Sequence, residues 1–317
     1  MKRFFRIEHF RAYPWAMQLL LFLLTIITMI GVGRYATLYY VANFTNYTLE
    51  QLVSFNSSSP LDLIHTSLVT NGILTSIFIF LLPAMLFAYF ATPRPAQYLG
   101  LRAPGKRVQL LLVLMVMLGA MPVLQMIETL MGLIHFSPAI KADQAASEKT
   151  MYAYLSMHTF GDFLRCFVFI AILPACGEEL FFRGVLLRFA RKRSRNMILP
   201  VLFTAAVFAY AHANIYGLPS IFLAGILLAV IYNLTGSLWC SIAAHMFFNG
   251  FQIFTTYFGN NTVASPATQS MSASVLFVVG GAILFAVSFY LLLKNKTPLP
   301  DNWAEDFTAA ELLAKAD

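Results

Sequence analysis

The feature that most limits the fold of this chain is a series of eight long apolar stretches, separated by polar segments. A membrane-spanning helix needs about 20 predominantly apolar residues, because the hydrocarbon core of a bilayer is about 30 Å thick. The stretches lie at 15–41, 69–92, 108–134, 158–188, 196–212, 218–235, 237–258 and 272–293. Only 11% of the 317 residues are charged, against about a quarter in soluble domains. We therefore predict an all-α, polytopic integral membrane protein with about eight transmembrane helices.

The spans are predicted to form one membrane domain over residues 1–317, because no internal repeat or soluble domain separates them. The polar segments 42–68, 135–157 and 259–271 are predicted to be loops, and 301–317 a tail with a short amphipathic helix. The fourth stretch is longer than a span requires, and proline disrupts helix interiors. We expect Pro174–Gly177 to interrupt this helix. The three cysteines form no CxxC pair, which argues against a disulfide framework or a zinc knuckle.

The positive charges are distributed unevenly between the two sides of the membrane. Segments on the side of the N-terminus hold 16 of the 21 lysine and arginine residues, whereas the opposite loops hold only Lys141 and Lys149. By the positive-inside rule, both termini are predicted to be cytoplasmic, in the inner membrane if the source is a bacterium. This topology also accounts for the net charge of +7 without a nucleic-acid partner.

Three charged residues in the fourth stretch indicate a functional site. Glu178, Glu179 and Arg183 lie where each charge costs about 2.5–3.5 kcal/mol on insertion scales. In a helix, Glu179 and Arg183 are four residues apart and share a face, in the order that favours an ion pair. Glu178 points about 100° away and stays free to act as a base. The competing interpretation is that these charges only lock helices together.

Two later stretches each contribute one histidine. Phe208 and His212 are four residues apart, and so are His245 and Asn249, so that each pair shares a helical face. Each pair alone is also explained by interhelical hydrogen bonds, which are ordinary in membrane proteins. Together with the glutamates, in successive segments, they predict one polar site inside the helix bundle.

The three motifs, in this order, resemble the CAAX protease and bacteriocin-processing family (CPBP, or Abi) of intramembrane proteases, which includes the type II CAAX prenyl endopeptidases. They read EExxxR from Glu178, FxxxH from Phe208 and HxxxN from His245. The resemblance covers about 160–258 and implies a catalytic core at 158–258. Residues 1–157 then hold the first three spans, and 259–317 hold the last span and the tail.

The resemblance also implies roles for these residues. Glu178 and His212 would activate a water molecule, and His245 and Asn249 would stabilise the oxyanion. The supporting residues would be Glu179, Arg183 and Phe208. A mechanism without a metal is favoured, with no cofactor. The alternative is a zinc site of Glu178, His212 and His245, because two histidines and a carboxylate suit zinc.

The expected partners are the lipid bilayer and a membrane-associated peptide or lipidated protein, and the CAAX resemblance adds a prenylated substrate. Two other classes of function remain open. Buried charges also mark the ion pathways of transporters, although the polar residues here occur only in the second half of the chain. A non-catalytic immunity protein is the other alternative.

Overall fold

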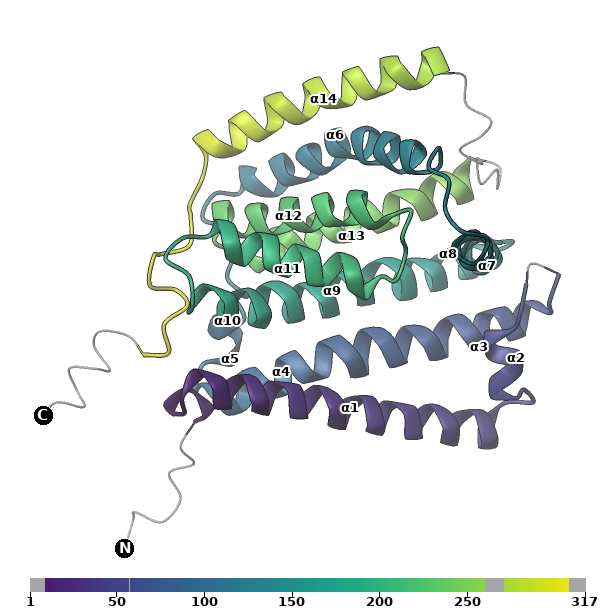
Figure 1. Ribbon diagram of the computed structural model, residues 1–317, viewed down its shortest axis with the longest axis horizontal. Helices are drawn as coiled ribbons and strands as arrows, with labels where there is room; N and C mark the ends of the chain where they lie inside the picture. The colour runs from purple at the N-terminus through teal and green to yellow at the C-terminus, as the bar shows by residue number, and fades with distance from the viewer. Residues whose placement is uncertain (1–8, 57, 260–270, 308–317) are drawn as a thin grey trace, which may run out of the picture.

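The computed structural model describes residues 9–56, 58–259 and 271–307, and within these ranges every regular element is helical. The described residues form eight long helical segments. These segments run side by side (Figure 1). Six of them are continuous in type: α1 (Trp15–Phe44), α6 (Val108–Met131), α11 (Ile198–Ala211), α12 (Leu218–Thr235), α13 (Leu238–Phe258) and α14 (Met271–Lys294). The all-α, polytopic prediction is confirmed.

The second and fourth segments are composites in which α-helix alternates with π-helix. The second, Leu61–Ala91, consists of α3 (Leu61–Gly72), η2 (Ile73–Leu81) and α4 (Leu82–Ala91). The fourth, Phe160–Arg191, consists of α8 (Phe160–Cys166), η3 (Phe167–Ile172), α9 (Leu173–Glu179), η4 (Leu180–Leu186) and α10 (Leu187–Arg191). Within the described residues, six segments are long and apolar enough to span a membrane. The other two are α11, which has only 14 residues, and α13, which carries more polar side chains.

The expectation that Pro174–Gly177 breaks the fourth helix is wrong. The helix continues through Pro174 from Phe160 to Arg191. Proline lacks an N–H and its ring crowds the preceding turn. Here the preceding turn is the π-helical η3, in which the N–H of Leu173 bonds to the carbonyl of Val168. The wider turn accommodates the proline without a break. Pro83 follows η2 in the same way.

Two segments predicted as loops contain helices. α7 (Pro138–Tyr154) occupies most of 135–157, and α2 (Leu49–Val53) lies within 42–68, whose last residues already belong to α3. Both helices begin with side-chain caps, Ser137 for α7 and the Thr48 capping box for α2. In Figure 1 α7 is seen end-on, so its axis lies across the long helices. The predicted loop at 259–271 falls almost entirely outside the described residues.

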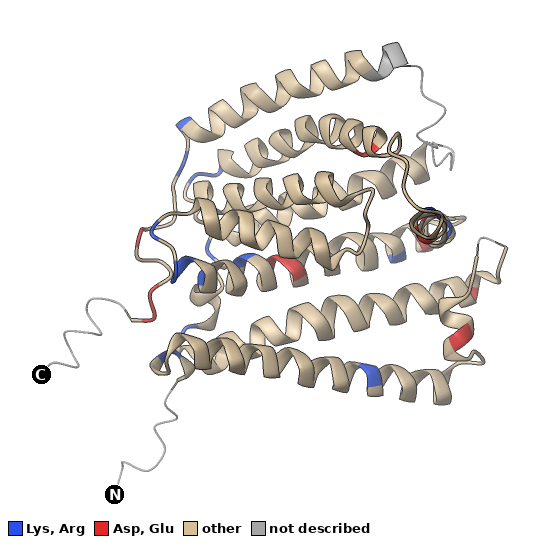
Figure 2. Cartoon of the chain, in the orientation of Figure 1, with Lys and Arg blue, Asp and Glu red and all other residues tan. Residues whose placement is uncertain are grey.

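The basic end of the bundle is closed by the segment that follows α14. Figure 2 shows most of the lysine and arginine residues at this end. The N–H groups of Thr297 and Leu299 bond to the carbonyls of Leu234 and Asn233 at the end of α12. Residues 301–306 form turns and a bend, while the remainder of the predicted tail helix, residues 308–317, is outside the described residues.

The main hydrophobic core packs the fourth segment against α1 and α4. Its centre is a cluster of phenylalanine rings in contact: Phe22, Phe87, Phe181, Phe182 and Phe189. α11 and α12 cover the other side of the same segment. The helix that carries Glu178 is thus held on both sides.

Candidate active site

Glu178 and Glu179 end α9 at a point where the fourth segment approaches the second very closely. A Cβ atom on Gly177 would lie 2.5 Å from the carbonyl oxygen of Ser76 in η2. Only glycine allows the two backbones to pack at this distance. The glycine before the glutamates therefore fixes their position relative to the second span.

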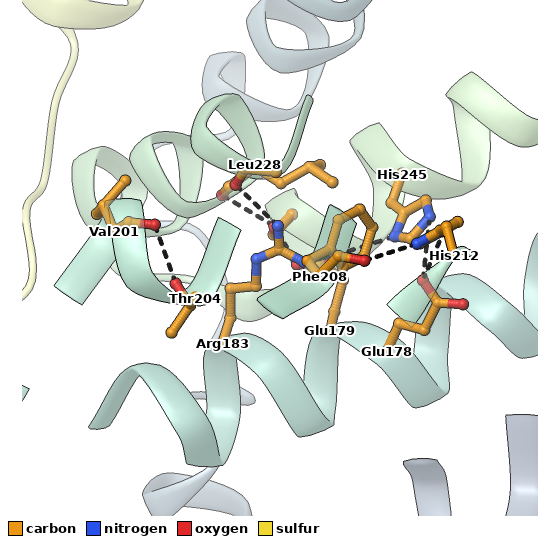
Figure 3. A network of polar contacts seen from close by, with 11 residues as sticks. Glu178, Glu179, Arg183, Val201, Thr204, Phe208, His212, Leu228 and His245 are labelled. Atoms are coloured by element: carbon orange, nitrogen blue, oxygen red, sulfur yellow. Dashed lines mark hydrogen bonds and ion pairs between the residues drawn. The ribbon is translucent and has the colours of Figure 1, made fainter. Parts of the chain in front are cut away.

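Glu179 is the centre of a completely buried polar cluster. Its Oε1 accepts from Nη1 of Arg183 at 2.6 Å and lies 3.0 Å from Nδ1 of His245. Its Oε2 accepts from the hydroxyl of Ser241 at 2.6 Å. Arg183 also donates to the carbonyl of Gly225 on α12, at 2.8 Å. The ion pair predicted from the sequence is present, and both glutamate oxygens have partners (Figure 3).

Glu178 points away from this pair, toward the two histidines (Figure 3). Its Oε2 lies 4.0 Å from Nε2 of His212 and 3.8 Å from Nε2 of His245. Both separations are too long for hydrogen bonds, and Oε2 is buried without a hydrogen-bond partner among the described residues. A bound water needs two to four polar partners, and three polar atoms converge here.

His212 ends α11 and turns its ring back along the helix. Its Nδ1 lies 2.8 Å from the carbonyl oxygen of Phe208. A carbonyl only accepts, so the proton is assigned to Nδ1, and Nε2 of the neutral ring presents a lone pair toward Glu178. The next residue, Ala213, has φ of 50°, a left-handed conformation that costs a non-glycine residue about 1–3 kcal/mol. The chain therefore reverses directly after the histidine.

Phe208 connects the histidine to the buried ion pair. Its ring centroid lies 4.6 Å from that of His212 and 4.7 Å from the guanidinium carbon of Arg183. The ring is 3% exposed and separates the arginine from the space around Glu178. The FxxxH spacing thus supplies both a carbonyl acceptor and a ring contact for the histidine.

His245 lies between the two glutamates, and Asn249 lies one turn further along α13. The described hydrogen bond of Asn249 runs from Nδ2 to the carbonyl oxygen of Ile170 in η3, at 3.2 Å. The structure therefore brings Glu178, His212 and His245 together, and it joins Asn249 to the neighbouring π-helical turn.

The three converging side chains also allow the zinc alternative to be examined. Imidazole nitrogen and carboxylate oxygen are donors that zinc accepts, and ligand atoms about 2.1 Å from a tetrahedral zinc lie about 3.4 Å apart. The Glu178 separations, 3.8 and 4.0 Å, exceed this value. In the described part of the chain, no group of three His, Cys, Asp or Glu side chains is arranged to hold a metal.

Ser241 is a member of this polar cluster that was not predicted from the sequence. It lies four residues before His245 and eight before Asn249, so it continues the same polar face of α13. The spacing of four residues was the available signal. It was not sufficient, because a serine inside an apolar helix usually bonds to its own backbone.

Access to this site is greatest beside His212. The side chain of His212 is 34% exposed, against 11% for Glu178 and 5% for His245. The end of α11 is therefore the more accessible side of the site, and the exposed residues near it include Tyr210 and Ile215.

Comparison with known families matches residues 160–251 to the model described as Type II CAAX prenyl endopeptidase Rce1-like. The matched segment contains all three sequence motifs, and the resemblance inferred from them is confirmed. Neither the curated proteins nor the solved structures contain a match to the chain.

Proposed function

From the match of residues 160–251 to the Rce1-like type II CAAX prenyl endopeptidases, which are peptidases, we propose that Glu178 is the base of an intramembrane hydrolysis. One observation carries the proposal. Oε2 of Glu178 is buried without a hydrogen-bond partner and faces Nε2 of both His212 and His245. Leaving a buried carboxylate oxygen unpaired is costly, which supports a functional reason for it.

In the proposed reaction, a water molecule lies between Glu178 and His212. The carboxylate of Glu178 takes one proton as the water oxygen attacks the carbonyl carbon of the scissile peptide bond. His212 orients the water through the lone pair on Nε2. When the tetrahedral intermediate collapses, the C–N bond breaks and the proton on Glu178 passes to the leaving amine. The carboxylate is restored, so the site returns to its starting state.

We assign the stabilisation of the oxyanion to His245 and Asn249. Nδ1–H of His245 already donates to Glu179, so donation from Nε2 requires a proton on both ring nitrogens. The carboxylates of Glu178 and Glu179, on either side of the ring, compensate that positive charge. Asn249 uses one N–H on Ile170 and retains a second for the substrate. Donors in a site screened from water contribute more to transition-state stabilisation than they would in solution.

The proposed substrate is a membrane-associated peptide or lipidated protein, and we favour a prenylated CAAX-type peptide. The family match supports the prenyl group, and the position of the site within apolar helices supports delivery of the peptide from the bilayer. A soluble peptide would have to desolvate before reaching Glu178, whereas a lipid anchor concentrates the substrate at the membrane.

The test is cleavage of a quenched fluorescent peptide by the purified full-length protein in nanodiscs. Three peptides of one sequence carry a farnesyl group, a palmitoyl group or no lipid. Glu178→Gln should reduce cleavage at least 1,000-fold, a magnitude typical of losing essential acid–base chemistry. The matched control is Glu128→Gln, which removes a carboxylate from α6, away from the three motifs. Equal cleavage by Glu178→Gln and wild type would refute the assignment of the base, and equal cleavage of all three peptides would refute lipid recognition.

A further inference from the structure

Ser241 is the innermost member of the polar face of α13. It is 0% exposed, and its described hydrogen bonds join it to Glu179 and Leu228 rather than to Glu178 or His212. Its role therefore depends on the groups that it contacts.

The hydroxyl of Ser241 has two acceptors within reach and one hydrogen to give. Oγ lies 2.6 Å from Oε2 of Glu179 and 3.0 Å from the carbonyl oxygen of Leu228. Leu228 is inside α12, where its carbonyl can accept an N–H from its own helix. A carboxylate is the stronger acceptor, and the contact to it is the shorter one. Ser241 therefore donates to Glu179.

This donation fixes the rotation of the Glu179 carboxylate. The terminal torsion of glutamate is broad and roughly twofold, so the side chain itself does not determine where each oxygen points. With Oε2 held by Ser241, Oε1 is directed at both Arg183 and Nδ1 of His245. The partner of His245 is thus set by a residue that does not touch the histidine.

We propose that Ser241 is a positioning residue of the peptidase reaction, which acts through Glu179 to hold Nε2 of His245 toward the reacting carbonyl. This inference deepens the proposed function and rests on it. Around metal-ligating histidines, removing an outer contact that orients the imidazole typically costs about 10–100-fold in affinity or activity, and we expect a loss of the same order here. A purely structural serine would instead contribute to stability alone.

The experiment compares Ser241→Ala with Ser288→Ala in the full-length protein. Ser288 is the matched control, because it is also buried and its described hydrogen bonds are to backbone carbonyls of its own helix, α14. We expect Ser241→Ala to lower kcat about 10–100-fold, with KM within about twofold of wild type and a fall in Tm of about 2–4 °C, because Oε2 of Glu179 loses its donor. Ser241→Cys, which keeps the size and a weak donor, should recover part of kcat. Ser288→Ala should leave kcat unchanged.

A second readout does not depend on turnover. In protein labelled with 15N-histidine, the Nδ1–H resonance of His245 is assigned by its loss in His245→Ala. The proposal predicts that this resonance shifts or broadens in Ser241→Ala and stays in place in Ser288→Ala. If wild-type protein cleaves no lipidated peptide, the proposed function fails while this spectrum still tests the linkage. An unchanged kcat or an unchanged His245 resonance would overturn the role of Ser241.

Discussion

Asn249 donates its side-chain amide to the carbonyl oxygen of Ile170, the carbonyl that precedes Pro174 by four residues. Pro174 lacks the N–H that any other residue would donate to a carbonyl of this preceding turn. The side chain of Asn249 therefore supplies a hydrogen-bond donor to the turn from which Pro174 removes one. This contact joins α13 to the segment that carries Glu178.

Asn249→Ala should reduce stability as well as activity. The change leaves the Ile170 carbonyl without this donor, and we expect a loss of about 1 kcal/mol, or about 2–4 °C in Tm. Residual cleavage should remain measurable, because His245 still faces the substrate. Thermal unfolding and kcat are measured on the same preparations. Asn43→Ala is the control, since its amide bonds to an exposed carbonyl of its own helix. A Tm identical to that of wild type would contradict the contact with Ile170.

Pro174→Ala provides a second test of the same contact. Alanine at this position restores an N–H to the turn that contains the carbonyl of Ile170. The loss of stability caused by Asn249→Ala should therefore be smaller in the Pro174→Ala background than in wild type. The double-mutant cycle is measured by thermal unfolding of the four proteins. Strict additivity of the two changes would show that the proline and the asparagine act independently.

Loss of the negative charge should affect protein stability differently at the two adjacent glutamates. Glu178→Gln removes a carboxylate whose Oε2 lacks a partner, so Tm should stay the same or rise while activity is lost. Glu179→Gln leaves the buried guanidinium of Arg183 without its counter-charge, which typically costs about 3–5 kcal/mol. Thermal unfolding and expression level distinguish the two variants. Equal stability would contradict the division of roles between them.

The contribution of the Lys192–Asp306 contact to stability should depend on pH. Lys192 pairs with Asp306, and burial lowers the pKa of Lys192 from its ordinary value of 10.5, while Asp306 opposes that shift. Asp306→Asn removes the opposing charge and should lower stability by about 1–3 kcal/mol at pH 7. A lowered lysine pKa means that the unfolded chain binds more protons, so stability rises with pH in the window below 10.5.

The difference in stability between wild type and Asp306→Asn should consequently become smaller as the pH is raised toward 10.5. At that pH Lys192 becomes neutral in both the folded and the unfolded chain. Thermal unfolding of both proteins between pH 7 and about pH 10 measures it. The Lys192→Met/Asp306→Asn double variant is the control and should show no such narrowing relative to wild type. A deficit that stays constant across this range would contradict a charged pair at this contact.

The fold was predictable from the sequence because apolar length alone identifies a membrane span. The start of the second span was predicted less accurately, because residues 61–66 mix polar and apolar side chains. α7 was not predicted, because its signals are a Ser137 cap and Pro138 rather than apolar periodicity. The π-helical turns were also missed. They depend on how a proline is accommodated by neighbouring helices, and Pro174 alone does not reveal it.

For the site, a spacing of four residues was informative wherever two side chains share a helix. It identified the Glu179–Arg183 pair and the contact between Phe208 and His212. It could not show that Asn249 reaches Ile170, or that Ser241 reaches Glu179, because both contacts join helices that are distant in the sequence. The depth of His212 relative to Glu178 also depends on how the helices pack. The two meet although the fourth helix is unbroken.

The most direct test of glutamate-based hydrolysis is the effect of chelation on cleavage of the farnesylated peptide. Wild type and Glu178→Ala are assayed with and without a strong zinc chelator, and then with zinc restored. We predict that wild type keeps its full rate under chelation and that Glu178→Ala is inactive in every condition. Cleavage that is lost on chelation and restored by zinc would contradict the metal-free mechanism and make Glu178, His212 and His245 metal ligands instead.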